Sequence, residues 1–234
     1  MQSAKKSKVF VSGQSNFPFF GAVISVVLGA LLLITGCNKL GQESSPAPQP
    51  QSSAAGQSPA GGSAADEAAK GAAVAWALRE DEIKNDPNGQ WAIQATSSSS
   101  YNDAQGQTAW SANQVAGPPN VERYSDDGRA WAPKAQDGGL EWLDLKYVKP
   151  VHASEVRVRE SYGSGALIKV ELFDEQDVPH TVWTGTDPTK ELNYLILKFP
   201  KTGYKTARVK LTLATNLVPG WNEIDAVQLV GTDQ

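Results

Sequence analysis

The sequence of 234 residues contains one cysteine and two histidines. The single cysteine, Cys37, excludes an intrachain disulfide, a zinc site made of several thiolates and a two-cysteine redox motif. Positive charge is also scarce, because 21 Lys and Arg stand against 25 Asp and Glu. Such a chain lacks the basic field that attracts nucleic-acid phosphates, so we exclude DNA and RNA as partners.

Motifs of the common enzyme classes are missing as well. A hydrolase triad needs a base beside its nucleophile, and we expect both histidines, His152 in a turn and His180, to be polar loop residues. The sequence has no nucleophile elbow, phosphate loop or zinc-protease motif. We therefore predict that the protein is not an enzyme. The catalytic alternative is a glycosidase, which uses two carboxylates. The acidic residues available for that role are Asp126, Asp127, Asp137, Asp144, Glu160, Glu223 and Asp225.

The first 36 residues have the three parts of a secretory signal peptide. Residues 1–16 are polar and carry three lysines, residues 17–34 are almost entirely apolar, and two small residues follow. A retained transmembrane helix is the alternative, because about 18 apolar residues nearly span a bilayer. The residues that follow the apolar run favour the signal peptide.

The segment Ile34-Thr35-Gly36-Cys37 resembles the lipobox of bacterial lipoproteins. The resemblance implies cleavage before Cys37, a diacylglycerol on its thiol and a further acyl chain, such as palmitate, on its amino group. Two or more acyl chains hold a protein stably on a membrane. Asn38 implies, by analogy, the outer membrane or cell surface. We predict an exported lipoprotein of the cell envelope, anchored through Cys37.

Residues 37–65 consist mainly of Ser, Ala, Gly, Pro and Gln and contain almost no charged or aromatic side chains. Such a segment has too little apolar surface to offset the entropy lost on ordering. We expect a disordered linker that lets the following domain extend away from the membrane.

Residues 66–87 are richer in Ala, Glu and Lys. Val74, Leu78 and Glu82 stand at helical spacing, and a segment rich in Asn, Asp, Pro and Gly then ends the pattern. The pattern predicts a short helix, and we expect Trp76 in it to contact the domain that follows.

From residue 88 to 234, short apolar runs alternate with polar residues at a period of two, and Gly, Pro, Asn and Asp bound each run. Each run has one polar and one apolar face, as antiparallel sheets require. We expect the polar face that carries Arg157, Arg159 and Glu160 to be solvated rather than to bind an anion. No long helical pattern intervenes, which favours two packed sheets. We predict an all-β fold, an antiparallel β-sandwich.

Five segments also carry a family resemblance, namely Trp91–Tyr101, Trp110–Asn120, Ala130–Pro133, Glu141–Leu145 and Val218–Val227. In this order they resemble a discoidin-type, galactose-binding-like module, in particular the variant associated with pappalysin-like proteins and bacterial exported proteins. The resemblance implies a jelly-roll sandwich with its recognition surface on loops at one end. The fold binds sugars, lipids and proteins alike, so it does not choose a ligand. The chain lacks the cysteine pair and the clear membrane-inserting loop hydrophobics of the blood-clotting C domains, which argues against phospholipid.

Resemblance to these modules also suggests a structural calcium ion. In them an Asp-bearing loop before a Trp, together with an acidic residue near the last strand, often holds calcium. Asp126, Asp127 and Glu223 match this arrangement approximately, and carboxylate oxygens suit calcium. The alternative is an ordinary Asp-Gly turn.

Candidate ligand-binding residues are Tyr124, Trp131, Trp221, Asn222 and Glu223. Trp221 follows a Pro-Gly turn, where its ring could stack on a sugar while Asn222 and Glu223 form hydrogen bonds. As an alternative, Trp131 belongs to the core and the loop around Trp221 only fixes itself to the sheet. We predict a non-catalytic binding module for a carbohydrate or an envelope protein; the alternative is a structural scaffold with no small ligand.

Overall fold

The computed structural model describes residues 63–102 and 108–234. The predicted signal peptide, Cys37 and most of the predicted linker lie outside these ranges. Within the described residues, no helix is both long and apolar enough to cross a membrane.

The helix expected before the domain is α1, which spans Ala64–Lys84. It begins with a capping box, in which the Ser63 side chain accepts a hydrogen bond from the Asp66 N–H and the Asp66 carboxylate binds the Ser63 N–H. The helix ends at Lys84, directly before the segment rich in Asn, Asp, Pro and Gly that was expected to end it, because Pro87 cannot continue a helical hydrogen-bond ladder.

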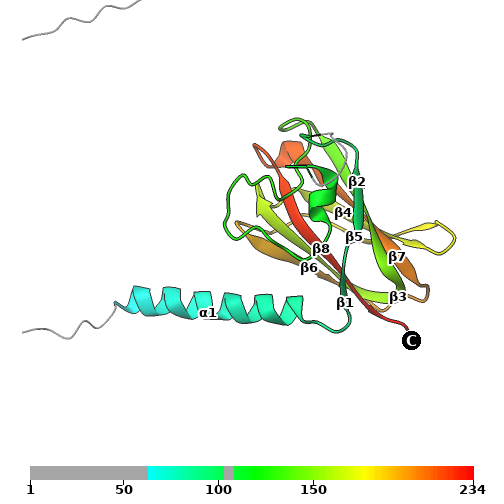
Figure 1. The fold of residues 1–234 in the computed structure, drawn as a ribbon, viewed down its shortest axis with the longest axis horizontal. Helices are drawn as coiled ribbons and strands as arrows, with labels where there is room; N and C mark the ends of the chain where they lie inside the picture. The colour runs from blue at the N-terminus through cyan, green and yellow to red at the C-terminus, as the bar shows by residue number, and fades with distance from the viewer. Residues whose placement is uncertain (1–62, 103–107) are drawn as a thin grey trace, which may run out of the picture. The chain divides into compact units, whose positions relative to one another are not determined.

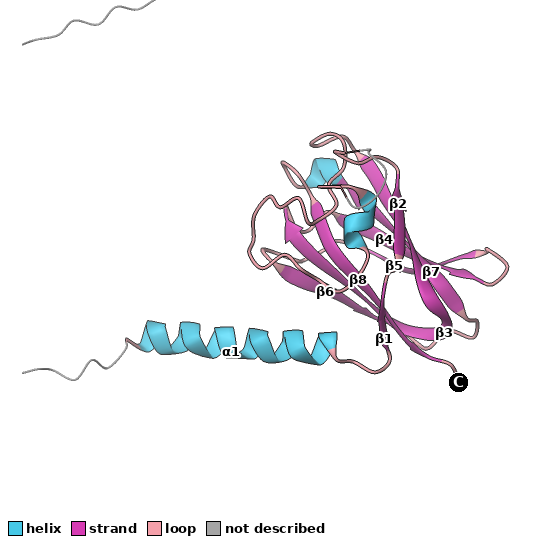
Figure 2. Ribbon diagram, in the orientation of Figure 1, coloured by secondary structure: helices cyan, strands magenta, loops and turns pink. Residues whose placement is uncertain are grey.

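Eight strands follow, together with two short 3-10 helices (Figure 2). They are β1 (Gly89–Trp91), β2 (Gln94–Ser97), η1 (Ala112–Val115), β3 (Leu140–Tyr162), β4 (Leu167–Asp174), β5 (Pro179–Thr184), β6 (Asn193–Lys198), β7 (Thr206–Ala214), η2 (Thr215–Leu217) and β8 (Glu223–Thr232).

The long strand β3 joins the two sheets of the sandwich (Figure 1). Its first part, Leu140–Lys146, pairs with β2 and β7, and β7 continues through β4 to β5. Its last part, Glu155–Tyr162, pairs with β6 and β8, and β8 continues to β1. All pairings between these strands are antiparallel, so the predicted all-β antiparallel sandwich is confirmed.

The core lies between the two sheets and consists of aliphatic side chains together with the rings of Trp131 and Tyr147. Leu145, Val170 and Leu211 from one sheet and Val156 and Leu229 from the other are fully buried. These residues are the apolar members of the alternating runs, and their burial supplies the main free energy of folding.

The prediction that His152 and His180 lie in loops is wrong. His152 lies within β3, which continues through the expected turn and only shifts its pairing there. His180 lies in β5, where its ring stacks on Tyr204 at 3.9 Å and Nε2 is 2.8 Å from the Asp174 carboxylate. Both rings are held by packing or hydrogen bonds within strands.

The polar face around Arg159 is not solvated, contrary to expectation. Arg159 is 4% exposed and binds both carboxylate oxygens of Glu80 in α1 at 2.7 Å, with Asp225 of β8 at 3.4 Å. Its guanidinium also lies over the rings of Trp76 and Tyr194. The contact predicted for Trp76 is confirmed. Helix α1 therefore covers charged side chains of β3 that the strand pattern predicted to be exposed to solvent.

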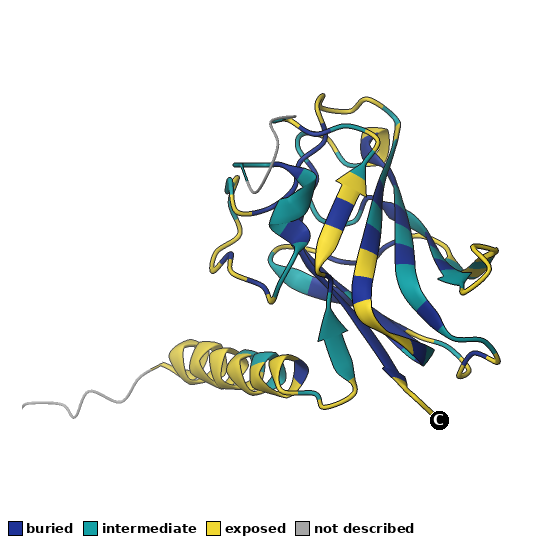
Figure 3. Ribbon diagram, turned by 45° about the vertical axis from the view of Figure 1, so that its right-hand side comes forward, coloured by how far each residue is buried: buried dark blue, intermediate teal, exposed yellow. Residues whose placement is uncertain are grey.

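Helix α1 makes these contacts only with its C-terminal half. Figure 3 shows exposed surface along most of its length, and Ile83 is its one buried residue. Gln228 of β8 donates a hydrogen bond to the Ile83 carbonyl at 2.8 Å, and Arg157 pairs with Asp86 at 2.9 Å. The docked end of the helix is therefore fixed by polar contacts together with the buried side chain of Ile83.

Candidate functional site

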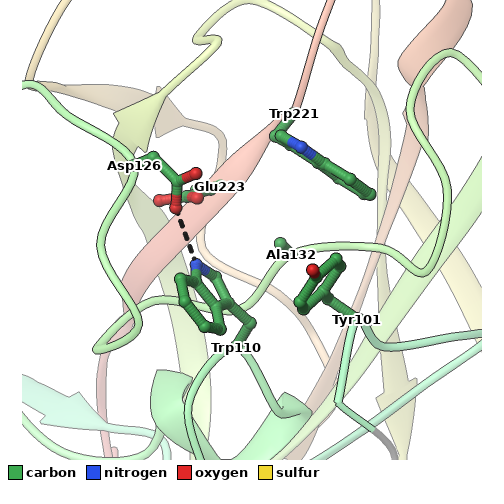
Figure 4. Close-up of a pocket in the computed structure, with 6 residues that line it drawn as sticks. All are labelled: Tyr101, Trp110, Asp126, Ala132, Trp221 and Glu223. Atoms are coloured by element: carbon green, nitrogen blue, oxygen red, sulfur yellow. Dashed lines mark hydrogen bonds between the residues drawn. The ribbon is translucent and has the colours of Figure 1, made fainter.

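A pocket of about 90 Å³ opens among the loops that precede β3 and β8 (Figure 4). Three aromatic rings, two carboxyl groups and one methyl group surround it. The lining residues are Tyr101, Trp110, Asp126, Ala132, Trp221 and Glu223.

Aromatic rings form one wall of the pocket. The ring of Tyr101 meets that of Trp110 edge to face at 5.3 Å and that of Trp221 at 5.2 Å. These separations and angles are typical of favourable aromatic pairs. Tyr101 is 55% exposed, so the wall it holds together is open to a ligand.

The backbone of Trp131 brings the loops of the pocket to β8. Its N–H and carbonyl exchange hydrogen bonds with Ile224 at 2.9 and 3.1 Å. This pairing puts Ala132, the next residue, beside Glu223, and the Ala132 carbonyl accepts a hydrogen bond from the Tyr101 N–H at 2.9 Å. One fully buried tryptophan therefore fixes both sides of the pocket.

Trp110 reaches the pocket through an unusual backbone conformation. Its φ is +58°, and its N–H donates to the Gly128 carbonyl at 2.9 Å. A side chain at Gly128 would meet the Ala109 methyl group at 2.8 Å, so only glycine permits this close approach. The indole N–H of Trp110 then donates to the Asp126 carboxylate at 2.9 Å.

Two carboxyl groups lie together on the side of the pocket opposite Trp221 (Figure 4). Glu223 is 1% exposed; one carboxylate oxygen accepts the Asp127 N–H at 3.1 Å, and the other has no hydrogen-bond partner among the described residues. Burial, together with the charge of Asp126, raises the pKa of Glu223 to about 8. At neutral pH the Glu223 carboxyl group therefore keeps its proton and can donate a hydrogen bond, and the neighbouring Asp126 carboxyl oxygens can accept one.

The family model described as pappalysin-1, SD scarf domain, C-terminal, matches residues 81–234. The chain belongs to this family. The predicted resemblance to pappalysin-associated modules is thereby confirmed, and the matched residues, here called the scarf domain, hold the whole sandwich and the end of α1. No curated protein matches the chain.

Several solved structures are similar to the scarf domain at low identity. A chitosan-binding module of a chitosanase/glucanase from Paenibacillus sp. IK-5 is 14% identical, with 60% of this chain and 96% of that chain covered and a TM-score of 0.44. The family 32 CBM from C. perfringens NanJ, in complex with galactose, is 14% identical, with 60% and 98% covered and a TM-score of 0.45. Allantoicase from Saccharomyces cerevisiae is 13% identical, with 62% and 44% covered and a TM-score of 0.45.

The scarf domain places only two of the predicted ligand-binding residues, Trp221 and Glu223, at the pocket. Trp131 is fully buried and its indole N–H donates to the Ser99 carbonyl at 3.0 Å, so it belongs to the core. Asn222 is 1% exposed and its amide binds the carbonyls of Gly163 and Val218 at 2.7 and 3.3 Å. For these two residues the structural alternative holds, because neither lines the pocket and each side chain is hydrogen-bonded within the domain.

Tyr124 lies outside the lining of the pocket. It is 44% exposed, packs on Tyr162 at 5.4 Å, and its hydroxyl accepts the Gly163 N–H at 3.2 Å. Its predicted ligand contact stays a prediction.

The three predicted calcium ligands are not brought together. Asp126 and Glu223 share the pocket, but the Asp127 carboxylate is turned to Arg129, with oxygen–nitrogen distances of 3.0 and 2.7 Å. In the described part of the chain no group of three His, Cys, Asp or Glu side chains could hold a metal ion. The partnerless oxygen of Glu223 beside Asp126 fits a cation, so calcium binding by these two residues stays a prediction.

Besides Ala132, the pocket residues that the list of candidates omits are the aromatic residues Tyr101 and Trp110. Both stand in the segments that carry the family resemblance, but outside the alternating runs. A large aromatic residue in a polar loop was the available signal, because such a side chain has no strand face to pack into. The two rings meet edge to face in the structure, and no periodicity in the sequence predicts that contact.

Proposed function

We propose that the scarf domain is a non-catalytic module that binds a carbohydrate in the pocket between Trp221, Tyr101 and the Asp126–Glu223 pair. The observation that carries the proposal is the exposed aromatic wall facing two carboxyl groups. Apolar faces of a sugar ring pack on aromatic rings, and its hydroxyl groups bind carboxylates. A pocket of about 90 Å³ admits a single small unit rather than a whole chain.

A glycan array probed with the detergent-solubilised full chain tests the proposal. We expect selective binding that Trp221→Ala abolishes. Trp142→Ala is the matched control, because Trp142 lies on β3 under Lys210, outside the pocket lining. Melting curves of both variants show whether each one folds.

Absence of glycan binding by a folded protein would instead favour an envelope protein partner or a purely structural role. Crosslinking in native envelopes would then identify what the domain contacts. If Trp221→Ala only lowers the melting temperature, the loop has a structural role and the proposal fails.

Glycosidase activity is a second candidate because the same pocket holds two carboxyl groups, those of Asp126 and Glu223. Hydrolysis of a glycoside requires two carboxyl groups, one that donates a proton and one that acts as base or nucleophile. Release of reducing ends from bound oligosaccharides, lost in Glu223→Gln, would establish hydrolysis. Binding without release supports the non-catalytic module.

We also propose that a lipid on Cys37 holds the protein in the cell envelope, at the outer membrane or cell surface. The support is the lipobox-like segment before Cys37, which lies outside the described residues. Cys37→Ser should move the protein from the membrane to the soluble fraction, and mass spectrometry of the wild-type N-terminal peptide should show acyl chains. Membrane retention of the Cys37→Ser protein would favour the transmembrane alternative.

A further inference from the structure

A second pair of acidic side chains is buried in the domain, namely Glu160 near the end of β3 and Asp187 after β5. Glu160 is 1% exposed and Asp187 is 6% exposed. Among the described residues, no Lys, Arg or His forms an ion pair with either of them. Two carboxylates in such a site cannot both remain charged without a large cost in free energy.

Backbone N–H groups donate hydrogen bonds to some, but not all, of the carboxyl oxygens of the pair. The Gly165 N–H binds one oxygen of Glu160 at 2.8 Å, and the Thr189 and Leu167 N–H groups bind Asp187 at 2.9 and 3.4 Å. The second oxygen of Glu160 has no partner among the described residues. A proton on that oxygen would remove one of the two charges.

The acid pair also holds the loop that supports Trp221. Glu160 is near the end of β3, and the loop Gly163–Gly165 follows directly. A methyl group on Gly163 would lie 2.1 Å from the Trp221 carbonyl oxygen, so the two backbones are in close contact. The Asn222 amide adds a hydrogen bond to the Gly163 carbonyl. The position of Trp221 therefore depends on a loop whose far end is tied to Glu160 through Gly165.

We propose that Glu160 and Asp187 share one proton and act, through the loop Gly163–Gly165, as positioning residues for Trp221. Burial and the charge of Asp187 raise the pKa of Glu160 to about 8, so the proton is held at neutral pH. When it is lost, the two charges repel, the Gly165 contact is strained and the aromatic wall moves. The consequence for carbohydrate affinity rests on the proposed function, whereas the movement of Trp221 does not.

Other groups around Glu160 define the controls. On the partner strands Asn193 of β6 and Ile224 of β8 lie opposite it, and neither carries a charge. Arg159, its neighbour on β3, is paired with Glu80. Glu223 has a similarly raised pKa and lies nearer to the pocket, so it must be neutralised before the effect of Glu160 is measured.

The experiment is a pH titration of the full chain labelled with 5-fluorotryptophan and followed by fluorine NMR. The Trp221 resonance is assigned by its loss in Trp221→Phe. In Glu223→Gln protein we expect this resonance to shift with a midpoint near 8. In Glu160→Gln/Glu223→Gln protein, where the proton is replaced by a permanent amide donor, the shift should vanish. Asp187→Asn in the same background gives a second test if the Glu160 variant does not fold.

Three outcomes would overturn the proposal: no titration in Glu223→Gln, a titration that persists in the double variant, or a midpoint that millimolar calcium moves to much lower pH. The last would show that a cation rather than a proton joins the pair. If a glycan binds, its affinity should fall up to tenfold per pH unit above the midpoint, the limit for one linked proton. If the resonance behaves as expected but no glycan binds, the proposed function fails and the positioning role stands.

Discussion

At the scale of single residues, Trp131 serves both the core and the pocket. Its side chain is fully buried and its backbone pairs with Ile224, so the same residue fills the interior and fixes the loop before β3. A large buried aromatic contributes to stability through its area, its close packing and its indole hydrogen bond.

Truncation of Trp131 should therefore destabilise the whole domain. We expect Trp131→Ala to lower the free energy of unfolding by about 3–5 kcal/mol, measured by urea denaturation. Trp142→Ala, on a partly exposed strand position, should cost clearly less. Equal losses for the two variants would contradict the central role of Trp131.

Glu223 makes stability depend on pH. Its pKa rises from an ordinary 4.5 to about 8 on folding, so between these values the unfolded chain releases a proton that the folded chain keeps. Stability is then greatest at low pH and falls as pH rises toward 8, by at most about 1.4 kcal/mol per pH unit for this group. Glu223→Gln should flatten the slope in urea melts between these two pH values. An unchanged slope would assign the dependence to other groups such as Glu160.

At the scale of elements, the loop between β3 and β4 depends on glycine at a point of close contact. Gly163 has a φ of +52° and almost touches the Trp221 carbonyl. We expect Gly163→Ala to cost more than about 1 kcal/mol and to weaken ligand binding with it. Gly203→Ala is the control, because a methyl group there meets nothing within 4 Å. Thermal melts of both variants suffice, and equal melting temperatures would contradict the contact.

Attachment of α1 depends on the buried guanidinium of Arg159. Arg159→Met keeps much of the side-chain volume but leaves the Glu80 and Asp225 carboxylates without their cation. Breaking a buried pair in this way costs about 3–5 kcal/mol. We expect α1 to become protease-sensitive in this variant, whereas Glu67→Gln, at the exposed start of the helix, should change nothing. Limited proteolysis with mass spectrometry measures the cleavage of α1. A helix that stays protected in Arg159→Met would show that Ile83 and Trp76 are sufficient to hold α1 on the domain.

At the scale of the whole molecule, a cation at Asp126 and Glu223 would join the loop before β3 to the start of β8. A ligand that binds only the folded state stabilises it by about 2.7 kcal/mol at a hundredfold excess over its dissociation constant. We expect calcium to raise the melting temperature and Asp126→Asn to remove the increase. Asp127→Asn should retain it, because that carboxylate faces Arg129. No shift with calcium in the wild-type protein would exclude the site.

The alternating runs in the sequence determined the sandwich, because period-two patterning fixes which face of each strand is buried whatever the partner strand is. Val170 and Leu172 needed no tertiary information to be placed in the core. The same local rule failed for Arg159 and Glu160, whose burial depends on a helix and a loop distant in the sequence. It failed for His152 as well, because only pairing with two different sheets keeps β3 continuous through that residue.

Trp221 and Glu223 could be found from sequence, since an aromatic residue after a Pro-Gly turn and a carboxylate beside it already suggest a binding loop. Their partners could not. Tyr101, Trp110 and Asp126 reach them only after Trp131 ties its loop to β8, and Glu160 of β3 meets Asp187 only after the segment that follows β5 has folded against β3. The sequence determines which side chains are available for binding. Only the folded sandwich determines the distances between segments far apart in the chain, and only burial in that fold raises the pKa values of the carboxyl groups.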